Sequence, residues 1–216
     1  METSTETKNV VIFGLSANPP TGLQGHTGVV KRLAQEFDEV WVMPVYRHMY
    51  SSKSGLADFE HRMRMCELSF ADTDGKVKVC AVEKDVMELR TQEQEGEDPA
   101  SIRIGSIDVI RYLKAESPSV SWSWALGADT YKDLQAGKWK CSEEFQDEAH
   151  LVVIPRVGQA EVALSGGARL MPVSTLGEVS STAVRATTDE ETLSKMLHPA
   201  VLGYIKEHGL YAFSTA

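Results

Sequence analysis

The stretch FGLSANPPTGLQGH, from Phe13 to His26, follows the short apolar run Val10–Ile12 and decides the fold of the chain. A strand that ends in a turn of Gly, Ser and Pro and restarts as a helix leaves unpaired backbone N–H groups facing outward. Together with the positive end of the helix dipole, these groups form a site for an anion. His26 stands where the helix should begin and adds a protonatable donor. The stretch therefore predicts a strand, an anion site and a helix, although an ordinary strand–helix connection with a surface histidine would give the same pattern.

A second stretch far along the chain, VSSTAVR at residues 179–185, has the same character. Arg185 lies three residues after Thr182, so both side chains can face one phosphate group, with the Arg as a charged fork. Simple helix capping is the alternative interpretation. The N-cap candidates are Ser180, Ser181 and Thr182. Two anion sites in one small domain predict a ligand that carries several phosphates.

The overall composition excludes several classes of protein. The chain has 216 residues, of which 42% are hydrophobic and 25% charged, as in an ordinary globular domain. A net charge of −9 argues against a nucleic-acid surface, which needs a basic patch. No apolar run approaches the ~20 residues that cross a bilayer, and the polar start METSTETKN predicts neither a signal peptide nor an anchor. We therefore expect an intracellular protein, cytoplasmic or nuclear, without nucleic-acid or membrane partners.

The three cysteines, Cys66, Cys80 and Cys141, are odd in number and widely spaced. This spacing fits neither a disulfide framework nor a zinc site, so reduced thiols are expected. No cluster of metal-binding carboxylates stands out in the sequence either. We expect no metal that is held by side chains alone.

Short apolar runs alternate with amphipathic stretches, which predicts a parallel sheet covered by helices on both faces. Val29, Leu33 and Phe37 recur at helical spacing after the first apolar run. The expected strands are 10–13, 40–45, 77–82, 121–126, 151–154 and 169–173. The expected helices are one around 29–37, about 58–70, about 106–114, 128–135, 190–197 and a last one that starts at Pro199.

The expected fold class is α/β, a Rossmann-like doubly wound parallel sheet in a single domain over residues 1–216, with a flexible start at 1–8. Ligands of such sheets bind beyond the carboxyl ends of the strands, where the first turn and the region around Gly127 both lie. One segment breaks the alternation of strands and helices. Residues 83–103 begin with the acidic run Glu83–Pro99 and are expected to form a variable surface loop, with a lid over the substrate as the alternative.

The two phosphate motifs, G-x-S-x-N-P-P-T…G-H and S-S-T-x-V-R, resemble those of the nucleotidylyltransferase superfamily. More narrowly, the chain resembles the nicotinate/nicotinamide mononucleotide adenylyltransferases over nearly its whole length except Glu83–Pro99. Further matching stretches are LADFEHR at 56–62, LGAD at 126–129 with Trp139 and Lys140, HLVV at 150–153 with Arg156 and Gly158, and HGLY at 208–211.

The resemblance implies a reaction. The 5′-phosphate of nicotinate or nicotinamide mononucleotide attacks the α-phosphorus of ATP, pyrophosphate leaves, and NAD or its deamido form is the product. The nucleophile is already an anion, so no general base is needed. His26, donating near the α-phosphate, and Arg185 would be the catalytic residues, and Mg²⁺ would be held mainly through ATP phosphates and water. The residues implied for ATP are Gly14, Ser16, Thr21, Gly25, Gly127, Asp129, Ser181 and Thr182.

The resemblance also implies a mononucleotide site made of Ser16, Asn18, Lys53, Trp139 and Arg156. Trp139 would stack on the pyridine ring, and Lys53 would meet a phosphate. Arg156 would meet either the mononucleotide phosphate or a nicotinate carboxylate. Asp129, on the ATP side, would accept from ribose hydroxyls. The residues alone also allow a core aromatic at Trp139, a solvated loop side chain at Lys53 and a helix N-cap at Asp129.

The chain departs from the family pattern at three places. Thr21 and His26 are five residues apart, where the family usually has three, which indicates a two-residue insertion that keeps His26 at the helix start. Met87 stands in the stretch DVME, where many relatives that accept nicotinamide carry an aromatic residue. Ser106, after Ile104 and Gly105, is a weak match to a further contact stretch of bacterial relatives.

Two alternative functions remain open. The chain could be a related nucleotidylyltransferase, such as phosphopantetheine adenylyltransferase, or a nucleotide-binding protein without catalytic activity. Trp139 and the tail at 208–211 argue against the first, and the retained phosphate motifs argue against the second. Trp122 and Trp124 are expected in the core, and the His61-Arg62 pair is expected to pin the second helix. The sequence is compatible with a homo-oligomer and does not decide between the acid and amide mononucleotides.

Overall fold

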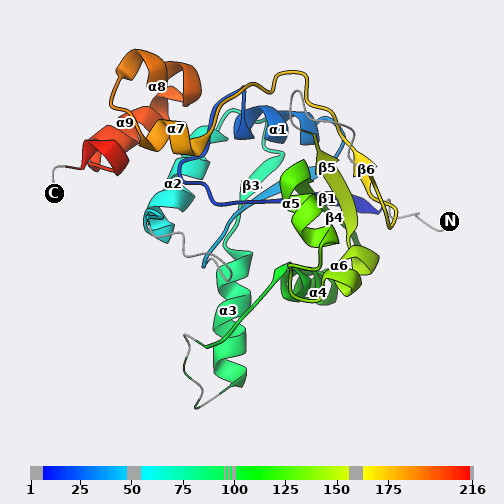
Figure 1. Ribbon diagram of the computed structural model, residues 1–216. Helices are drawn as coiled ribbons and strands as arrows, with labels where there is room; N and C mark the ends of the chain where they lie inside the picture. Colours follow the sequence, from blue (N-terminus) through cyan, green and yellow to red (C-terminus); the bar gives the residue numbers. More distant parts are fainter. Residues whose placement is uncertain are drawn as a thin grey trace.

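A computed structural model describes residues 7–47, 55–94, 96, 98, 101–155 and 163–214. Within these residues, six parallel strands form one sheet in the order β3-β2-β1-β4-β5-β6 (Figure 1). The strands are β1 (Lys8–Leu15), β2 (Glu39–Pro44), β3 (Val77–Val79), β4 (Val120–Gly127), β5 (His150–Ile154) and β6 (Arg169–Leu170). The predicted α/β fold with a doubly wound parallel sheet is therefore confirmed.

The strand order places the first strand beside the fourth. β1 and β4 pair in parallel, with Ile12 opposite Trp124. From β1 the chain winds outward to β2 and β3, then returns to β4 and winds outward the other way. Such a reversal leaves space at the carboxyl ends of the two central strands, which makes it the usual ligand position in α/β sheets. Here those ends are Leu15 and Gly127.

Helices cover both faces of the sheet, and the alternation of side chains along β1 shows which helix lies on which face. Val10 and Ile12 pack in one core cluster with residues of α3, α4, α5 and α6, whereas Val11 and Phe13 pack in another with α1 and α2. The helices are α1 (His26–Leu33), α2 (Phe59–Ser69), α3 (Val82–Glu93), α4 (Ser106–Glu116), α5 (Ala128–Gln135), α6 (Ser142–Glu148), α7 (Ser181–Arg185), α8 (Glu190–Met196) and α9 (Pro199–Glu207), and a short 3-10 turn η1 follows at Tyr211–Phe213.

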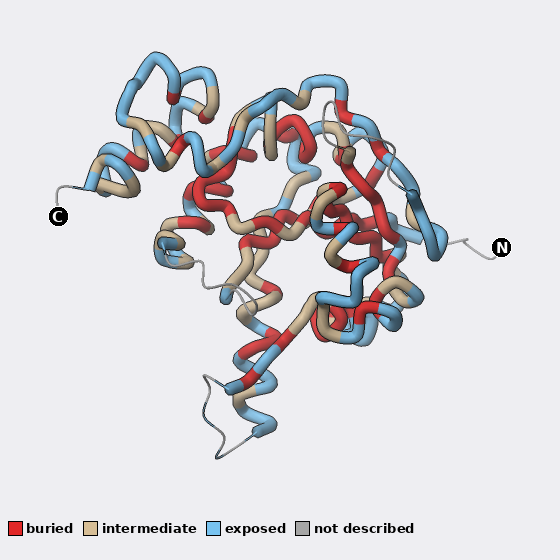
Figure 2. Tube along the Cα trace, viewed as in Figure 1, coloured by how far each residue is buried: buried red, intermediate tan, exposed pale blue. Residues whose placement is uncertain are grey.

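The C-terminal helices form a third, smaller core against α2. Met65 of α2 packs with Val184 of α7, Leu193 of α8 and Ile205 of α9. Figure 1 shows these helices gathered on one side of the molecule, and Figure 2 shows the buried residues running along the central strands. Pro199 is the first residue of α9, as its position in the sequence predicted. The packing brings the chain at 181–185 back to the first turn.

The prediction of an acidic loop over residues 83–103 was wrong for residues 83–93, because Val82–Glu93 form α3. The described residues between Gln94 and Gly105 belong to no helix or strand. Val82, Val86 and Met87 are buried on one face of α3 and pack in the core cluster of Val10 and Ile12, while Asp85, Glu88 and Glu93 are exposed. Since Val82 begins the helix, the predicted strand 77–82 ends early, at Val79.

Other boundaries also differ from the sequence predictions. Lys8 lies in β1, where it forms an ion pair with Glu39, so this end of the predicted flexible start is ordered; residues 1–6 lie outside the described part. The strand predicted at 169–173 covers only Arg169–Leu170, and α6 was not predicted. Trp122 and Trp124 are core residues, each 3% exposed, as predicted. The three cysteines form no disulfide, and none of the described helices has the length and apolar character needed to span a membrane.

Candidate functional site

The turn between β1 and α1 holds Thr21 and His26 in direct contact. The backbone N–H of Thr21 donates to Nδ1 of His26 at 3.0 Å, and the Thr21 Oγ1 lies 2.8 Å from the same nitrogen. In return, the backbone N–H of His26 donates to Thr21 Oγ1 at 3.1 Å. The longer spacing between these two residues therefore does not separate them. The turn closes on itself so that His26 is the first residue of α1.

These contacts set the protonation state of His26. A backbone N–H can only donate, so the Nδ1 atom that receives it carries no proton, and the neutral ring must hold its proton on Nε2. The ring is half-buried next to Phe13, with the two ring centroids 6.2 Å apart. Burial lowers the pKa of His26 to about 4, because the charged form loses its hydration. At neutral pH, His26 is thus a neutral donor through Nε2.

Gly25 makes this closed turn sterically possible. A Cβ atom at this position would lie 2.0 Å from Thr21 Oγ1, which no side chain can tolerate. Thr21 itself is 1% exposed, and its carbonyl accepts from both the backbone N–H and the hydroxyl of Thr27. The buried Thr21 hydroxyl therefore faces His26, and the Gly25 backbone passes against it.

The second phosphate motif is attached directly to this turn. Ser181 Oγ donates to the carbonyl of Pro19 at 2.8 Å, and Arg185 Nη1 donates to the carbonyl of Asn18 at 2.7 Å. Within α7, Arg185 Nη2 lies 3.3 Å from Thr182 Oγ1, a hydroxyl that can accept from it. The two motifs that the sequence analysis treated as separate anion sites thus form one surface. The N-cap of α7 is Ser180, whose side chain accepts from the backbone N–H of Ala183.

Asn18 links the same turn to the connection between β2 and α2. Its Nδ2 donates to the carbonyl of Gly55 at 3.0 Å, and its Oδ1 accepts from the backbone N–H of Ala57 at 3.0 Å. Asn18 is 5% exposed, so both ends of its amide serve the protein rather than open solvent. Its carbonyl receives Arg185, which makes Asn18 a junction between three segments.

The carboxyl end of β4 lies across the switch point from this turn. Gly127 is the N-cap of α5, and no atom lies within 4 Å of where its Cβ would be, so the backbone there is open. Asp129 is in the first turn of α5, one position past the first helical residue, and is therefore not the N-cap. Gly14, near the end of β1, has only Trp124 and Met43 side chains nearby, at 3.7 and 3.9 Å from its virtual Cβ.

Trp139 lies in the connection between α5 and α6, partly buried against the larger core. Its ring packs on Phe145, with centroids 5.6 Å apart and planes inclined by 32°. The neighbouring Lys140 touches the start of α4, where its Cβ lies 3.0 Å from the virtual Cβ of Gly105. Trp139 and the weakly matched Ser106, the first residue of α4, therefore come from adjoining segments. Two further predicted contacts, Lys53 and Arg156, lie outside the described residues.

The family of the chain follows from comparison with known proteins. The model of the family described as cytidylyltransferase-like matches residues 12–187, from β1 through α7. The chain belongs to the cytidylyltransferase-like family. The match thus starts in the strand before the His26 turn and ends just after Arg185, so it spans both the turn and α7.

Individual relatives agree with this family and narrow it. One curated relative is a Myxococcus xanthus protein named probable nicotinate-nucleotide adenylyltransferase. Its sequence is 28% identical to that of this cytidylyltransferase-like protein over 203 residues, which are 94% of each chain. Two solved structures of the Plasmodium falciparum nicotinic acid mononucleotide adenylyltransferase, one complexed with NaAD and one with APC, share its fold at 20% identity, with TM-scores of 0.74 and 0.73. Each covers 97% of this chain and 100% of its own. These names confirm the resemblance that the sequence motifs indicated.

The sequence predicted only that Arg62 helps to hold the second helix in place. In the structure its side chain forms a network of hydrogen bonds near the site. Arg62 of α2 is 2% exposed and donates to four main-chain carbonyls, those of Ser16, Val45, Tyr46 and Ala57. Each of these residues lies just after a strand or just before α2, at the carboxyl edge of the sheet. Carbonyl acceptors leave no mark in a sequence, so only the buried arginine itself could have indicated this network.

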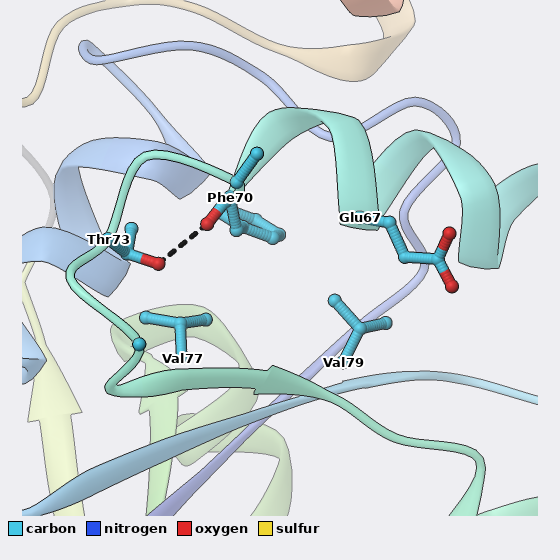
Figure 3. Close-up of a pocket in the computed structure, with 7 residues that line it drawn as sticks. Glu67, Phe70, Thr73, Val77 and Val79 are labelled. Atoms are coloured by element: carbon cyan, nitrogen blue, oxygen red, sulfur yellow. Dashed lines mark hydrogen bonds between the residues drawn. The ribbon is translucent and has the colours of Figure 1, made fainter.

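Two hollows of the cytidylyltransferase-like domain, both partly open, are lined by neither His26 nor Arg185. A cavity of about 250 Å³ separates α2 from β3, lined by Glu67, Phe70, Thr73, Val77 and Val79 among others (Figure 3). Glu67 is its one ionisable side chain, which does not suit a phosphate ligand. A second space of about 470 Å³ lies behind the His26 turn, between α1 and the α8–α9 connection. Among the described residues, no three His, Cys, Asp or Glu side chains gather as a metal site.

Proposed function

We propose that the chain transfers the AMP group of ATP to nicotinate or nicotinamide mononucleotide, with release of pyrophosphate. The observation that carries the proposal is the union of two phosphate motifs, one with His26 and one with Arg185, at the switch point of the sheet. A binding surface that joins a neutral donor to a fixed cation suits a polyphosphate whose charge moves during reaction. The names of the curated relatives support the choice of the pyridine mononucleotide.

In this reaction the two substrates react directly with each other, and no side chain of the protein forms a covalent bond to either. An oxygen of the mononucleotide 5′-phosphate bonds to the α-phosphorus of ATP while the bond from that phosphorus to the bridging oxygen breaks. The electron pair leaves with pyrophosphate, so no proton has to be removed from the nucleophile. Catalysis then rests on holding two anions in line and on stabilising the negative charge that builds on the departing group.

His26 serves the α-phosphate in this proposal. The Nε2–H is set by the acceptor role of Nδ1, so the donor needs no reorganisation when the reaction begins. Thr21, proposed from its sequence position as an ATP contact, has its hydroxyl turned to the imidazole. We therefore assign Thr21 to positioning His26, and we assign Gly25 to the close passage of the backbone.

Arg185 serves the β- and γ-phosphates. Guanidinium has five N–H donors, and the contacts to Asn18 and Thr182 use one from each terminal nitrogen, which leaves donors for phosphate oxygens. Ser181 donates its hydroxyl proton to the Pro19 carbonyl, so we assign Ser181 to attaching α7 to the turn. Thr182 keeps its hydroxyl proton for a phosphate oxygen while it accepts from Arg185.

The remaining contacts fall on either side of the switch point. For ATP, we assign the ribose to Gly127 and Asp129 at the start of α5, where the backbone is open, with Gly14 and Ser16 at the end of β1 allowing close approach. For the mononucleotide, we assign Trp139 to the pyridine ring and retain Ser16, Asn18, Lys53 and Arg156 as proposed contacts. Mg²⁺ enters as part of the substrate Mg-ATP, because an ion that keeps most of its water needs no cage of side chains.

The test is pyrophosphate release by the purified protein with Mg-ATP and each mononucleotide in parallel. We expect turnover with at least one of them, and the ratio of the two kcat/KM values gives the preference between acid and amide. Phosphopantetheine serves as the competing acceptor. Turnover with phosphopantetheine alone would assign the chain to the sibling reaction, and ATP binding without any pyrophosphate release would make it a non-catalytic binder.

A further inference from the structure

We infer that Arg62 and Glu83 are positioning residues, a buried clamp that fixes the Val45-Tyr46 backbone against the first turn and thereby sets the affinity for the mononucleotide. This inference rests on the proposed function for its kinetic part. Its structural part, the fixation of one peptide group, is independent of any activity. Neither side chain is expected to touch a substrate.

The Arg62 half of the clamp joins three segments that lie at the carboxyl edge. Its guanidinium donates to Val45 at 2.6 Å, to Ser16 at 3.2 Å and to Tyr46 at 3.4 Å, while Nε donates to Ala57 at 2.8 Å. No described carboxylate lies within ion-pair distance of Arg62; the buried cation is held by carbonyl groups and lies over the ring of Phe59, 5.4 Å from its centroid. A planar fork with fixed donors suits this task, and a lysine could reach only part of the set.

The Glu83 half approaches the same peptide from the opposite side. Glu83, in the first turn of α3, accepts from the backbone N–H of Tyr46 through Oε2 at 2.9 Å. The N–H of Tyr46 is thus held by one helix, α3, and the Val45 carbonyl of the same peptide group by another, α2. The ring of Tyr46 also meets Phe59 of α2 edge-on, with centroids 5.1 Å apart. A peptide held on both sides, with its side chain packed, has little freedom to shift.

The clamp secures one end of the β2–α2 connection, and Asn18 secures the other. Asn18 holds Gly55 and Ala57 through its amide, and Arg62 also holds Ala57. Ser16 and Asn18 are both proposed mononucleotide contacts, and both are tied into this network by main-chain or side-chain bonds. Ser16 is also proposed to approach ATP, but His26 and Arg185, which are assigned to the ATP phosphates, have no bond to Arg62 or Glu83 among their described contacts. Loosening the clamp should therefore weaken mononucleotide binding more than ATP binding.

The kinetic test compares Arg62→Lys and Glu83→Leu with Glu83→Gln, which keeps an oxygen acceptor in place. We expect Arg62→Lys to raise the mononucleotide KM about tenfold, with kcat and the ATP KM within about threefold of wild type. Glu83→Leu should raise the mononucleotide KM several-fold, and Glu83→Gln should restore it. The matched controls are Arg64→Lys and Glu88→Leu, exposed positions on the same two helices. Equal rises in both KM values, or a loss confined to kcat, would overturn the positioning role.

The structural test is hydrogen exchange of the Tyr46 amide. We expect exchange at least tenfold faster in Glu83→Leu than in wild type, and close to wild type in Glu83→Gln and Glu88→Leu. Unchanged exchange in Glu83→Leu contradicts the clamp even if the enzyme is active. If wild type shows no turnover with either mononucleotide, the proposed function fails while this measurement still decides the clamp. If Arg62→Lys does not fold, the Glu83 pair of variants carries both tests.

Discussion

The two halves of the proposed phosphate surface, the Thr21–His26 turn and α7, are built in opposite ways. On the turn side, the buried Thr21 and the half-buried, neutral His26 are five residues apart in sequence and bonded to each other. On the α7 side, Ser181 and Arg185 come from the far end of the chain, and they reach the turn only through the carbonyls of Pro19 and Asn18. One half is a self-contained unit and the other is a charged element docked onto it.

This difference indicates that the two halves serve different phosphates of ATP. A neutral hydrogen-bond donor suits the α-phosphate, where the bond changes, because its strength does not depend on capturing a proton from solvent. A permanent cation suits the outer phosphates, where negative charge accumulates as pyrophosphate departs. If this division is correct, changes on the turn side should lower kcat, and changes on the α7 side should mainly raise the KM for ATP.

The largest effect is expected from His26→Ala. Removal of one preorganised donor to a developing oxyanion costs about 10²–10³ in kcat, and the fold should survive because the imidazole is only half-buried. The measurement is kcat at saturating substrates together with the melting temperature. His150→Ala, at an exposed position on β5, is the control. A folded His26→Ala variant with wild-type kcat would remove His26 from the chemistry.

Arg185→Ala should act mainly on ATP binding. The lost charged hydrogen bonds are worth about 1.5–3 kcal/mol, which corresponds to a rise in the ATP KM of roughly 10- to 100-fold. The mononucleotide KM should change far less. Arg90→Ala, an exposed residue paired with Glu93 on α3, controls for loss of a positive charge. A fall in kcat as deep as that of His26→Ala, with an unchanged ATP KM, would break the proposed division.

Thr21→Val should produce a smaller loss on the turn side. The variant keeps the shape and the backbone N–H to Nδ1 but removes the hydroxyl, which takes away one of two contacts to the imidazole and the acceptor of the His26 backbone N–H. One hydrogen bond of about 0.5–1.5 kcal/mol predicts a kcat about 2- to 10-fold lower. Thr21→Ser restores the hydroxyl and should recover most of the activity. No difference between the Val and Ser variants would mean that the backbone contact alone positions the ring.

The smallest effect is one of pH on stability. Burial lowers the pKa of His26 to about 4, so between that value and its ordinary 6.5 the unfolded chain binds more protons than the folded one. The stabilisation from a neutral His26 is therefore complete above pH 6.5 and is lost as the pH falls towards 4. At pH 5 the loss is about 2 kcal/mol, or several degrees in melting temperature. The His26→Ala variant should lack this loss, and NMR titration of the imidazole measures its pKa directly.

Sequence alone predicted the parts of the molecule that depend on local patterns. The parallel sheet followed from alternating apolar runs, and the anion turn followed from Gly, Pro and His at the end of the first run. The acidic composition around Glu83 concealed α3, whose apolar face consists of Val82, Val86 and Met87 only. α6 has a single large buried side chain, Phe145, which is too little for a periodic signal.

The candidate site shows the same limit. The residue types at 21, 26, 181 and 185 could be chosen from the sequence, but their mutual attachment could not. Ser181 and Arg185 dock on carbonyl groups, and every residue has a carbonyl, so no pairing of side chains marks the contact. The five-residue spacing of Thr21 and His26 suggested an altered site, whereas a turn that closes around Gly25 keeps them in contact.

The attachment of α7 to the first turn has a consequence for the order of synthesis. Pro19 leaves the ribosome 162 residues before its partner Ser181. A nascent chain contains the turn around His26 and all six described strands before it contains α7. In the proposed mechanism, the guanidinium assigned to the outer phosphates is therefore added after the sheet, and a premature stop before Arg185 should yield a chain that does not transfer AMP.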